Sequence, residues 1–235
     1  MNIKTDMHAN FTIKLVLLAA LLALASGCGS MPSFSLPSIW PFSSDENQND
    51  GEVKVDLQAA RPAGIPLVPP PSMMRIDGKD GSLDKKLAAG SSEQMAPIAY
   101  FSESKSWKRY TEKESDTPTP DILAYAAVAQ NKGDPLSIQD FAGIKNSIIQ
   151  SSGAQEMHIL ANQARFITFQ SADKGVGKHG RQIDVEIIST MMIIDGRVVT
   201  LYMINSAGPD YTNMCRNIAL RWRDAYLRAS RPLAS

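Results

Sequence analysis

The sequence predicts an α+β domain in which helices pack on an antiparallel sheet, preceded by a signal peptide and a disordered tether. Three observations predict this fold class. Asp195-Gly196 separates two runs rich in β-branched and long apolar residues, which is typical of a two-residue β-hairpin. Apolar residues at helical spacing lie before and after this hairpin. From Gly29 to about Ser72 the chain is rich in Ser, Pro, Asn and Asp, which leaves little to bury in a core.

Residues 1–27 are expected to form the signal peptide. Lys4 and Lys14 lie in a polar leader, and eleven apolar residues follow from Leu15 to Ala25. A transmembrane helix needs about 20 apolar residues, so this run is too short for a comfortable span. Positive charge, a short apolar stretch and then small residues are typical of an export signal. The alternatives are an ordinary secretory signal followed by a chance cysteine, and an uncleaved anchor.

The end of this segment, Leu24-Ala25-Ser26-Gly27-Cys28, resembles the lipobox of bacterial lipoproteins, with Ala25 where that family usually has leucine. The resemblance covers roughly the first 30 residues. It implies cleavage before Cys28, a diacylglyceryl group on that cysteine, and often a further acyl chain on its amine. Two or more acyl chains anchor a protein stably to a membrane. Gly29, rather than Asp, implies sorting to the outer membrane, facing the periplasm.

The charge balance argues against nucleic acid as a partner. Cleavage would remove two of the 24 basic side chains and one of the 24 acidic ones, leaving 22 and 23. A mature chain so close to neutrality has no overall field to attract nucleic acid. Nucleic-acid binding is therefore not expected.

Residues 28–72 are expected to be the lipidated cysteine and a Pro/Ser-rich tether. Eight of the fourteen prolines lie in this segment, and proline withholds backbone donors from regular structure. A flexible coil of this length reaches on the order of 35–40 Å. The apolar island Ile39-Trp40-Pro41-Phe42 could touch the membrane interface or a partner, or could simply belong to the linker.

Residues 73–231 are expected to form the single α+β globular domain. Ile98 to Tyr110 and Ile122 to Gln130 are the first predicted strands, although the second is alanine-rich and could be helical. Ser137 then precedes a predicted helix, and Asp140 is placed for a capping-box-like start. One face of this helix carries Ile138, Phe141, Ile144, Ile148 and Ile149, and Gly153 lies just past its end.

The sheet continues with a predicted strand from Arg165 to Ser171. Gly175 to Gly180 is then interpreted as the loop that leads into the hairpin of Gln182 to Ile194 and Arg197 to Asn205. A last helix is expected to begin around Pro209, a residue favoured in the first helical turn. Its apolar positions recur at helical spacing and comprise Met214, Cys215, Ile218, Trp222, Ala225, Tyr226 and Ala229.

The predicted order is strands, helix, at least three strands and helix, which favours an antiparallel sheet with helices packed against it. The final strand, Asp195-Gly196 turn, strand and helix resemble the PsbP/Mog1-like α/β sandwich in pattern, over roughly the C-terminal hundred residues. That likeness rests on no diagnostic motif, and no binding site is transferred from it.

Cysteine and histidine usage provides no support for a metal site. Cys28 and Cys215 are the only cysteines, so a disulfide-stapled scaffold is excluded if Cys28 carries lipid. Cys215 is then either a small buried apolar residue or a functional thiol. His158, in a predicted connector, and His179, in the glycine loop, have no metal-ligand spacing. Each is interpreted as an exposed polar residue.

Other motifs also have simpler interpretations. Gly175-Val176-Gly177-Lys178 lacks the Lys-Ser or Lys-Thr ending of a phosphate loop and leads into a strand. Asp45 to Gly51 and Asp77 to Gly81 depart from the calcium-loop pattern and are interpreted as solvated linker and turn. The arginines of the last helix could bind phosphate or lipid headgroups, but a solvated face is the simpler interpretation. These are Arg216, Arg221, Arg223 and Arg228.

No catalytic, metal or cofactor residue is therefore predicted. The leading hypothesis is a non-enzymatic envelope lipoprotein, held on a membrane by lipid on Cys28, whose periplasm-facing domain binds a protein partner or assists an envelope assembly. One alternative is a small-ligand binding domain whose pocket lies between a sheet face and the loop from Gly175 to Gly180. Another is an enzyme whose catalytic residues follow no recognisable motif.

Overall fold

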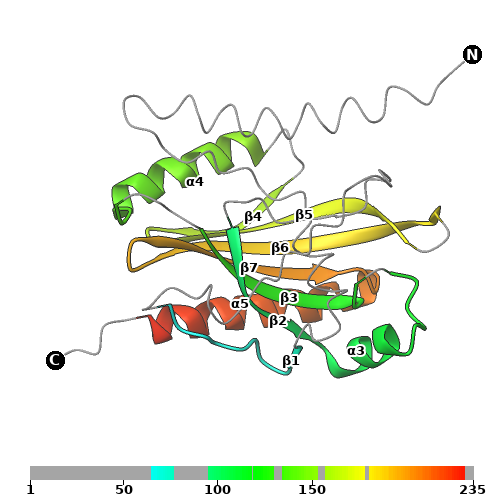
Figure 1. The fold of residues 1–235 in the computed structure, drawn as a ribbon. Coiled ribbons are helices and arrows are strands. Elements are labelled where there is room, and N and C mark those ends of the chain that lie inside the picture. Colours follow the sequence, from blue (N-terminus) through cyan, green and yellow to red (C-terminus); the bar gives the residue numbers. More distant parts are fainter. Residues whose placement is uncertain are drawn as a thin grey trace, which may run out of the picture.

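The computed structural model describes residues 65–76, 95–117, 119–129, 134–152, 157–177 and 180–230. Its centre is a seven-stranded sheet with strand order β1-β2-β3-β7-β6-β5-β4, in which every neighbouring pair is antiparallel. The predicted α+β class, with helices packed on an antiparallel sheet, is confirmed (Figure 1). The expected signal peptide, Cys28 and most of the expected tether lie outside the described residues.

The elements follow one another along the chain in a simple order. The strands are β1 (Met74–Ile76), β2 (Met95–Ser102), β3 (Ile122–Ala129), β4 (His158–Gln163), β5 (Phe166–Val176), β6 (Gln182–Ile194) and β7 (Arg197–Asn205). The helices are α3 (Ser104–Thr111), α4 (Ile138–Ser152), the short 3-10 helix η3 (Pro209–Tyr211) and α5 (Thr212–Ala229).

The hairpin predicted from Asp195-Gly196 is present as β6 and β7. Ile194 pairs with Arg197 across the turn, and both turn residues have positive φ, 46° at Asp195 and 70° at Gly196. Positive φ at both central residues is the requirement of a type I′ turn. Glycine is needed for space as well, because a Cβ at residue 196 would lie 2.3 Å from the Cβ of Pro135.

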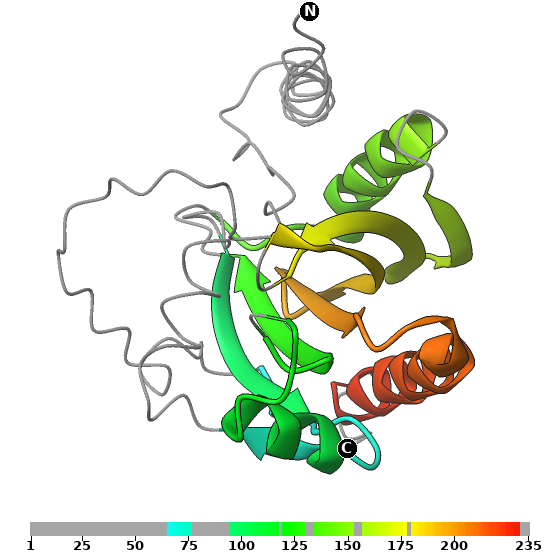
Figure 2. The same ribbon diagram turned by 90° about the vertical axis from the view of Figure 1, so that its right-hand side faces the viewer.

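The sheet buries both of its faces. Helix α4 covers one face, where Phe141, Ile144 and Ile148 join the same core as the stacked rings of Tyr125 and Tyr202, whose centroids are 4.6 Å apart. Helix α5 lies on the opposite face (Figure 2). Because β3 lies between these two cores, all eight of its residues are buried. It is a strand, and the helical alternative for its alanine-rich sequence is wrong.

The strand expected from Ile98 to Tyr110 is wrong in its second half. Strand β2 ends at Ser102, and α3 occupies Ser104–Thr111. The Glu103 side chain caps this helix by accepting a hydrogen bond of 2.8 Å from the backbone N–H of Ser106. Such a cap satisfies one of the donors that a helix start leaves unpaired. The cap and the aromatic contacts of Trp107 with the core therefore outweigh the local β propensity.

The start of α4 is confirmed as a capping box. The Ser137 Oγ accepts a hydrogen bond of 3.1 Å from the backbone N–H of Asp140, and Asp140 Oδ2 accepts one of 2.8 Å from the backbone N–H of Ser137. The Ser137 hydroxyl also donates to Asp140 Oδ2 at 2.7 Å, and this bond, together with the one from the Ser137 backbone N–H, lowers the pKa of the Asp140 carboxyl because both favour its charged form. Gly153, expected just past the helix, lies outside the described residues.

Two other boundaries differ from the expectation. His158 begins strand β4, rather than lying in a connector, and its side chain is exposed as expected. Strand β5 continues past Ser171 to Val176 because it pairs along its full length with β6, so Gly175 belongs to a strand and not to a loop. Lys178 and His179 lie outside the described residues.

The chain enters the packed domain on the α5 face. Ile65 is fully buried in the core that contains Trp222 and Tyr226. The indole Nε1 of Trp222 donates a hydrogen bond of 2.6 Å to the carbonyl of Val68. The packed chain thus begins at least at Ile65, upstream of the start at Met73 that the sequence suggested.

Candidate interaction edge

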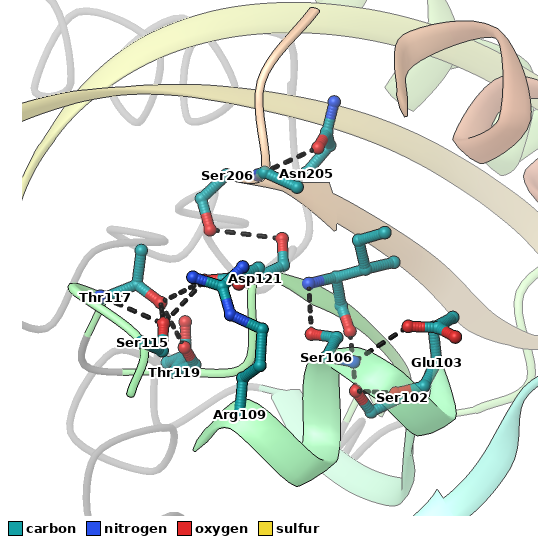
Figure 3. Close-up of polar contacts among 12 residues, drawn as sticks. Ser102, Glu103, Ser106, Arg109, Ser115, Thr117, Thr119, Asp121, Asn205 and Ser206 are labelled. Carbon is teal, nitrogen blue, oxygen red and sulfur yellow. Dashed lines mark hydrogen bonds and ion pairs between the residues drawn. The ribbon is translucent and has the colours of Figure 1, made fainter. Parts of the chain in front are cut away.

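A buried carboxylate, Asp121, organises the largest polar cluster in the described structure (Figure 3). Its Oδ1 accepts hydrogen bonds from Ser115 Oγ at 2.6 Å and from Thr117 Oγ1 at 2.9 Å. Its Oδ2 accepts one from Arg109 Nη1 at 2.8 Å. Asp121 is 6% exposed, so its charge is balanced chiefly by these three partners.

The geometry of this cluster indicates a structural role. The Ile122 backbone N–H donates to Ser106 Oγ of α3, and the backbone N–H of Ser206, after β7, donates to the carbonyl of Asp121, both at 2.8 Å. The cluster therefore ties α3, the turn before β3 and the end of β7 together. Ser115 is only 1% exposed, which leaves its hydroxyl no approach for a substrate.

A second polar network lies under the beginning of α5 and changes the interpretation of the arginines. Arg216 Nη2 donates to Gln170 Oε1 at 2.7 Å, and Gln170 Nε2 donates in turn to Glu186. Arg223 is 13% exposed, pairs with Asp224 at 2.8 Å and lies 4.8 Å from the centre of the Phe166 ring.

The expected solvated face of four arginines is therefore divided, because Arg221 and Arg228 are exposed whereas Arg216 and Arg223 pack against the sheet. The exposed pair also has Asp224 between its two members, with 46% of its side chain exposed. The four side chains do not gather into one basic site, and they provide no support for a phosphate or headgroup site.

Cys215 fits the role of a small buried apolar residue. It is 1% exposed on the α5 face of the sheet. Burial, and to a smaller extent the negative charge of Glu186, raise the pKa of its thiol from 9.0 to about 12. A thiol that stays protonated is a poor nucleophile and a poor metal ligand.

We expect Cys215 to resist a thiol-specific disulfide reagent in the native protein at pH 8 and to react fully in denaturant. Because its pKa is raised in the folded state, the stability that the protonated thiol contributes is present below pH 9 and is lost as the pH rises towards about 12. Rapid native labelling at pH 8, at the rate of the denatured chain, would contradict this assignment.

The remaining sequence candidates, for metal binding and for membrane contact, do not form a site in the residues that the structure describes. Within the described segments, no group of three His, Cys, Asp or Glu side chains could hold a metal ion. No helix among those segments is long and apolar enough to cross a membrane. The two acidic stretches, Asp45 to Gly51 and Asp77 to Gly81, the apolar island Ile39 to Phe42 and Cys28 lie outside the described residues.

The outer side of the sheet at β4 has a different character, and we call it the α4–β4 edge. It consists of strand His158–Gln163 with Ala142, Lys145 and Ile149 of the neighbouring helix. Strand β4 pairs with β5 on one side only, at the end of the strand order. Figure 2 shows it in yellow-green at the margin of the sheet, between α4 and α5. No described strand covers its outer side.

Lys145 fixes how α4 lies against this edge. Its Nζ donates to Asn162 Oδ1 at 3.1 Å and also to the carbonyl of Gln163. Lys145 is 8% exposed, and burial lowers the pKa of its ammonium group. The side chain therefore joins the middle of α4 to the last residues of β4, and Ile149, one helical turn further on, lies towards the beginning of β4.

The exposed part of the α4–β4 edge is partly apolar, because its one lysine, Lys145, is buried. Ile159 and Ile149 are 37% and 36% exposed. Ile159 pairs with the core residue Phe169, so both isoleucines belong to the α4 side of the sheet. Strand β4 contains no Asp, Glu, Lys, Arg or Pro, the residues that usually protect an edge strand. A one-residue bulge at Leu160 is its only such feature.

Sequence reasoning missed this edge because it placed a connector at His158. The available signal was Ile159-Leu160-Ala161 between polar neighbours, just ahead of the strand that begins at Phe166. Comparison with protein-family models, with curated proteins and with solved structures finds no match.

Proposed function

We propose that this chain is a membrane-anchored envelope lipoprotein with a non-catalytic domain that binds a protein partner through the α4–β4 edge. Lipid on Cys28 holds the chain at the outer membrane, and the domain faces the periplasm. The observation that carries the binding role is the outer side of β4, whose strand has no Asp, Glu, Lys, Arg or Pro and carries the exposed Ile159 beside the exposed Ile149 of α4.

The anchor is supported by the resemblance of residues 24–28 to a lipobox and by the composition of the segment that follows. Thirty-six residues separate Cys28 from Ile65, which is the first residue that the structure describes and is buried. As a flexible coil, such a segment spans on the order of 35 Å. A domain tethered at that distance can contact partners close to the membrane surface, where confinement raises their effective concentration.

The binding role is supported by the chemistry of an edge strand. Its outward N–H and C=O groups can pair with an extended segment of a partner, and neighbouring side chains then contribute specificity. Two buried groups of a kind that can serve catalysis have structural roles here: Asp121 holds a turn, and the Cys215 thiol is buried and protonated. Gly175 and Val176 belong to β5, so the loop proposed for the alternative ligand pocket begins later in the chain than expected.

We expect the substitution Ile159→Lys to abolish capture of the partner. Full-length tagged protein, solubilised from envelopes in mild detergent, should retain a partner in stoichiometric amount. A lysine charge on β4 would oppose pairing of another strand at this edge. The control is Met74→Lys, because Met74 is 42% exposed on β1, at the opposite margin of the sheet. Equal capture by both variants would contradict the role of the α4–β4 edge.

A further inference from the structure

We propose that the partner at the α4–β4 edge is a second copy of this chain, so that two β4 strands pair antiparallel about a twofold axis perpendicular to the sheet. This inference rests on the proposed function, because it names the occupant of that same edge. A twofold interface brings the same surface of each copy together. The surface must therefore be compatible with itself in charge, in shape and in its relation to the membrane.

The charges of the edge allow self-association. Strand β4 contains no Asp, Glu, Lys or Arg, and its one titratable residue, His158, is the first of the strand, so an antiparallel pair places the two histidines at opposite ends and brings no like charges into contact. Lys145 is the one cation in the middle of α4, and its Nζ is turned back onto Asn162 and Gln163 of its own β4. The twofold operation therefore places neutral strands against each other, whereas like charges directly opposite would destabilise the pair.

Contact between the two copies of α4 would add buried surface area that pairing of the β4 strands alone does not provide. A stable interface buries about 800 Å² on each partner, far more than the exposed parts of two isoleucines provide. A twofold axis perpendicular to the sheet keeps both copies of α4 on the same face. The two helices then lie side by side and antiparallel, with the axis passing between Lys145 and Ile149 and the small Ala142 further out. Ile149 and Ile159, each more than one-third exposed, are buried together by this arrangement.

The point at which the chain enters the domain is consistent with this symmetry. Ile65 and Val68 lie on the α5 face, opposite α4. The same axis that keeps both α4 helices on one face keeps both entry points on the other. The two tethers that start at Cys28 can therefore reach one membrane from the same side of a continuous sheet. Lipid anchoring of both copies would also raise their effective concentration.

The test uses two full-length copies with different tags, expressed together and purified through one tag in mild detergent. We expect the second tag to co-purify, and Ile159→Lys in both copies to reduce its recovery about tenfold or more, as expected when a charge is placed in a neutral strand interface. Met74→Lys in both copies should leave the recovery unchanged. Circular dichroism melts of both variants check that each remains folded.

A cross-linking experiment leaves β4 intact and locates the axis. Ile149→Cys should give a covalent dimer with a short bis-maleimide in intact envelopes. Ile138→Cys should give none, because Ile138 lies eleven residues, or about 16 Å, further along the same helix. Ile138 is 54% exposed, so the reagent can reach it. The wild-type chain serves as the control for reaction at Cys215.

Three outcomes would overturn the second-copy assignment: no co-purification of the second tag, co-purification that survives Ile159→Lys, or equal cross-linking at residues 138 and 149. If the second tag is not recovered but Ile159→Lys still abolishes capture of a different envelope protein, the proposed function stands and only the second-copy assignment fails. If neither partner depends on Ile159, both proposals fail.

Discussion

Replacing Trp222 with alanine is expected to reduce the free energy of unfolding by about 3–5 kcal/mol, the cost typical of removing a fully buried Trp or Phe side chain. Trp222 is fully buried on the α5 face. Its ring lies edge-on to Phe101, with centroids 5.8 Å apart, and 6.0 Å from Tyr226. The substitution also removes the hydrogen bond from the indole to Val68, which holds the entering chain against the domain.

Urea denaturation followed by far-ultraviolet circular dichroism measures this loss without relying on Trp222 itself. Trp222→Phe retains a ring but removes the hydrogen bond to Val68, so its effect should be smaller than that of alanine. Trp107→Ala is the matched control, because Trp107 is only partly buried, on the opposite face of the sheet. A loss below about 1 kcal/mol for Trp222→Ala would contradict the packing described here.

The second large effect is expected at Asp121. Asp121→Ala should cost on the order of 3 kcal/mol, because it leaves the buried hydroxyls of Ser115 and Thr117 without their carboxylate acceptor and removes the ion partner of Arg109. Hydrogen exchange should accelerate at the backbone N–H of Ser206, which donates to the Asp121 carbonyl, as the turn before β3 loosens.

Asp184→Ala provides the matched control for the loss of a carboxylate. Asp184 pairs with Lys174 on β5, but its side chain is 79% exposed. Surface ion pairs contribute little to stability, so this variant should unfold almost as the wild-type protein does. If the two aspartate variants had equal stability, the Asp121 cluster could not have the structural role assigned to it.

The hairpin and the two covering helices were predictable because their signals are local. Asp195-Gly196 has the residue types that positive φ demands, and Ser137 with Asp140 forms a capping box within four residues. The start of the last helix was nearly right: Pro209 opens the 3-10 turn η3, and α5 begins three residues later at Thr212.

The features that were missed depend on contacts between distant parts of the chain. Helix α3 is held to β3 by Ser106, whose Oγ accepts a hydrogen bond from the backbone N–H of Ile122, sixteen residues away. The Asp121 cluster likewise draws Arg109 from α3. Strand β4 has no strict alternation of apolar and polar residues, and its position at the sheet margin follows from the strand order. Such an order is set by tertiary packing and cannot be read from local spacing.

Membrane anchoring requires lipid at Cys28, and the mass of the mature N-terminus tests for this lipid most directly. Mass spectrometry of protein extracted from envelopes should find a chain that begins at Cys28 and carries added mass of a diacylglyceryl group, with or without a further acyl chain. Cys28→Ser should lack that mass and should be lost from the lipidated fraction. A mature chain that begins at another residue, or one that begins at Cys28 without lipid, would contradict the account.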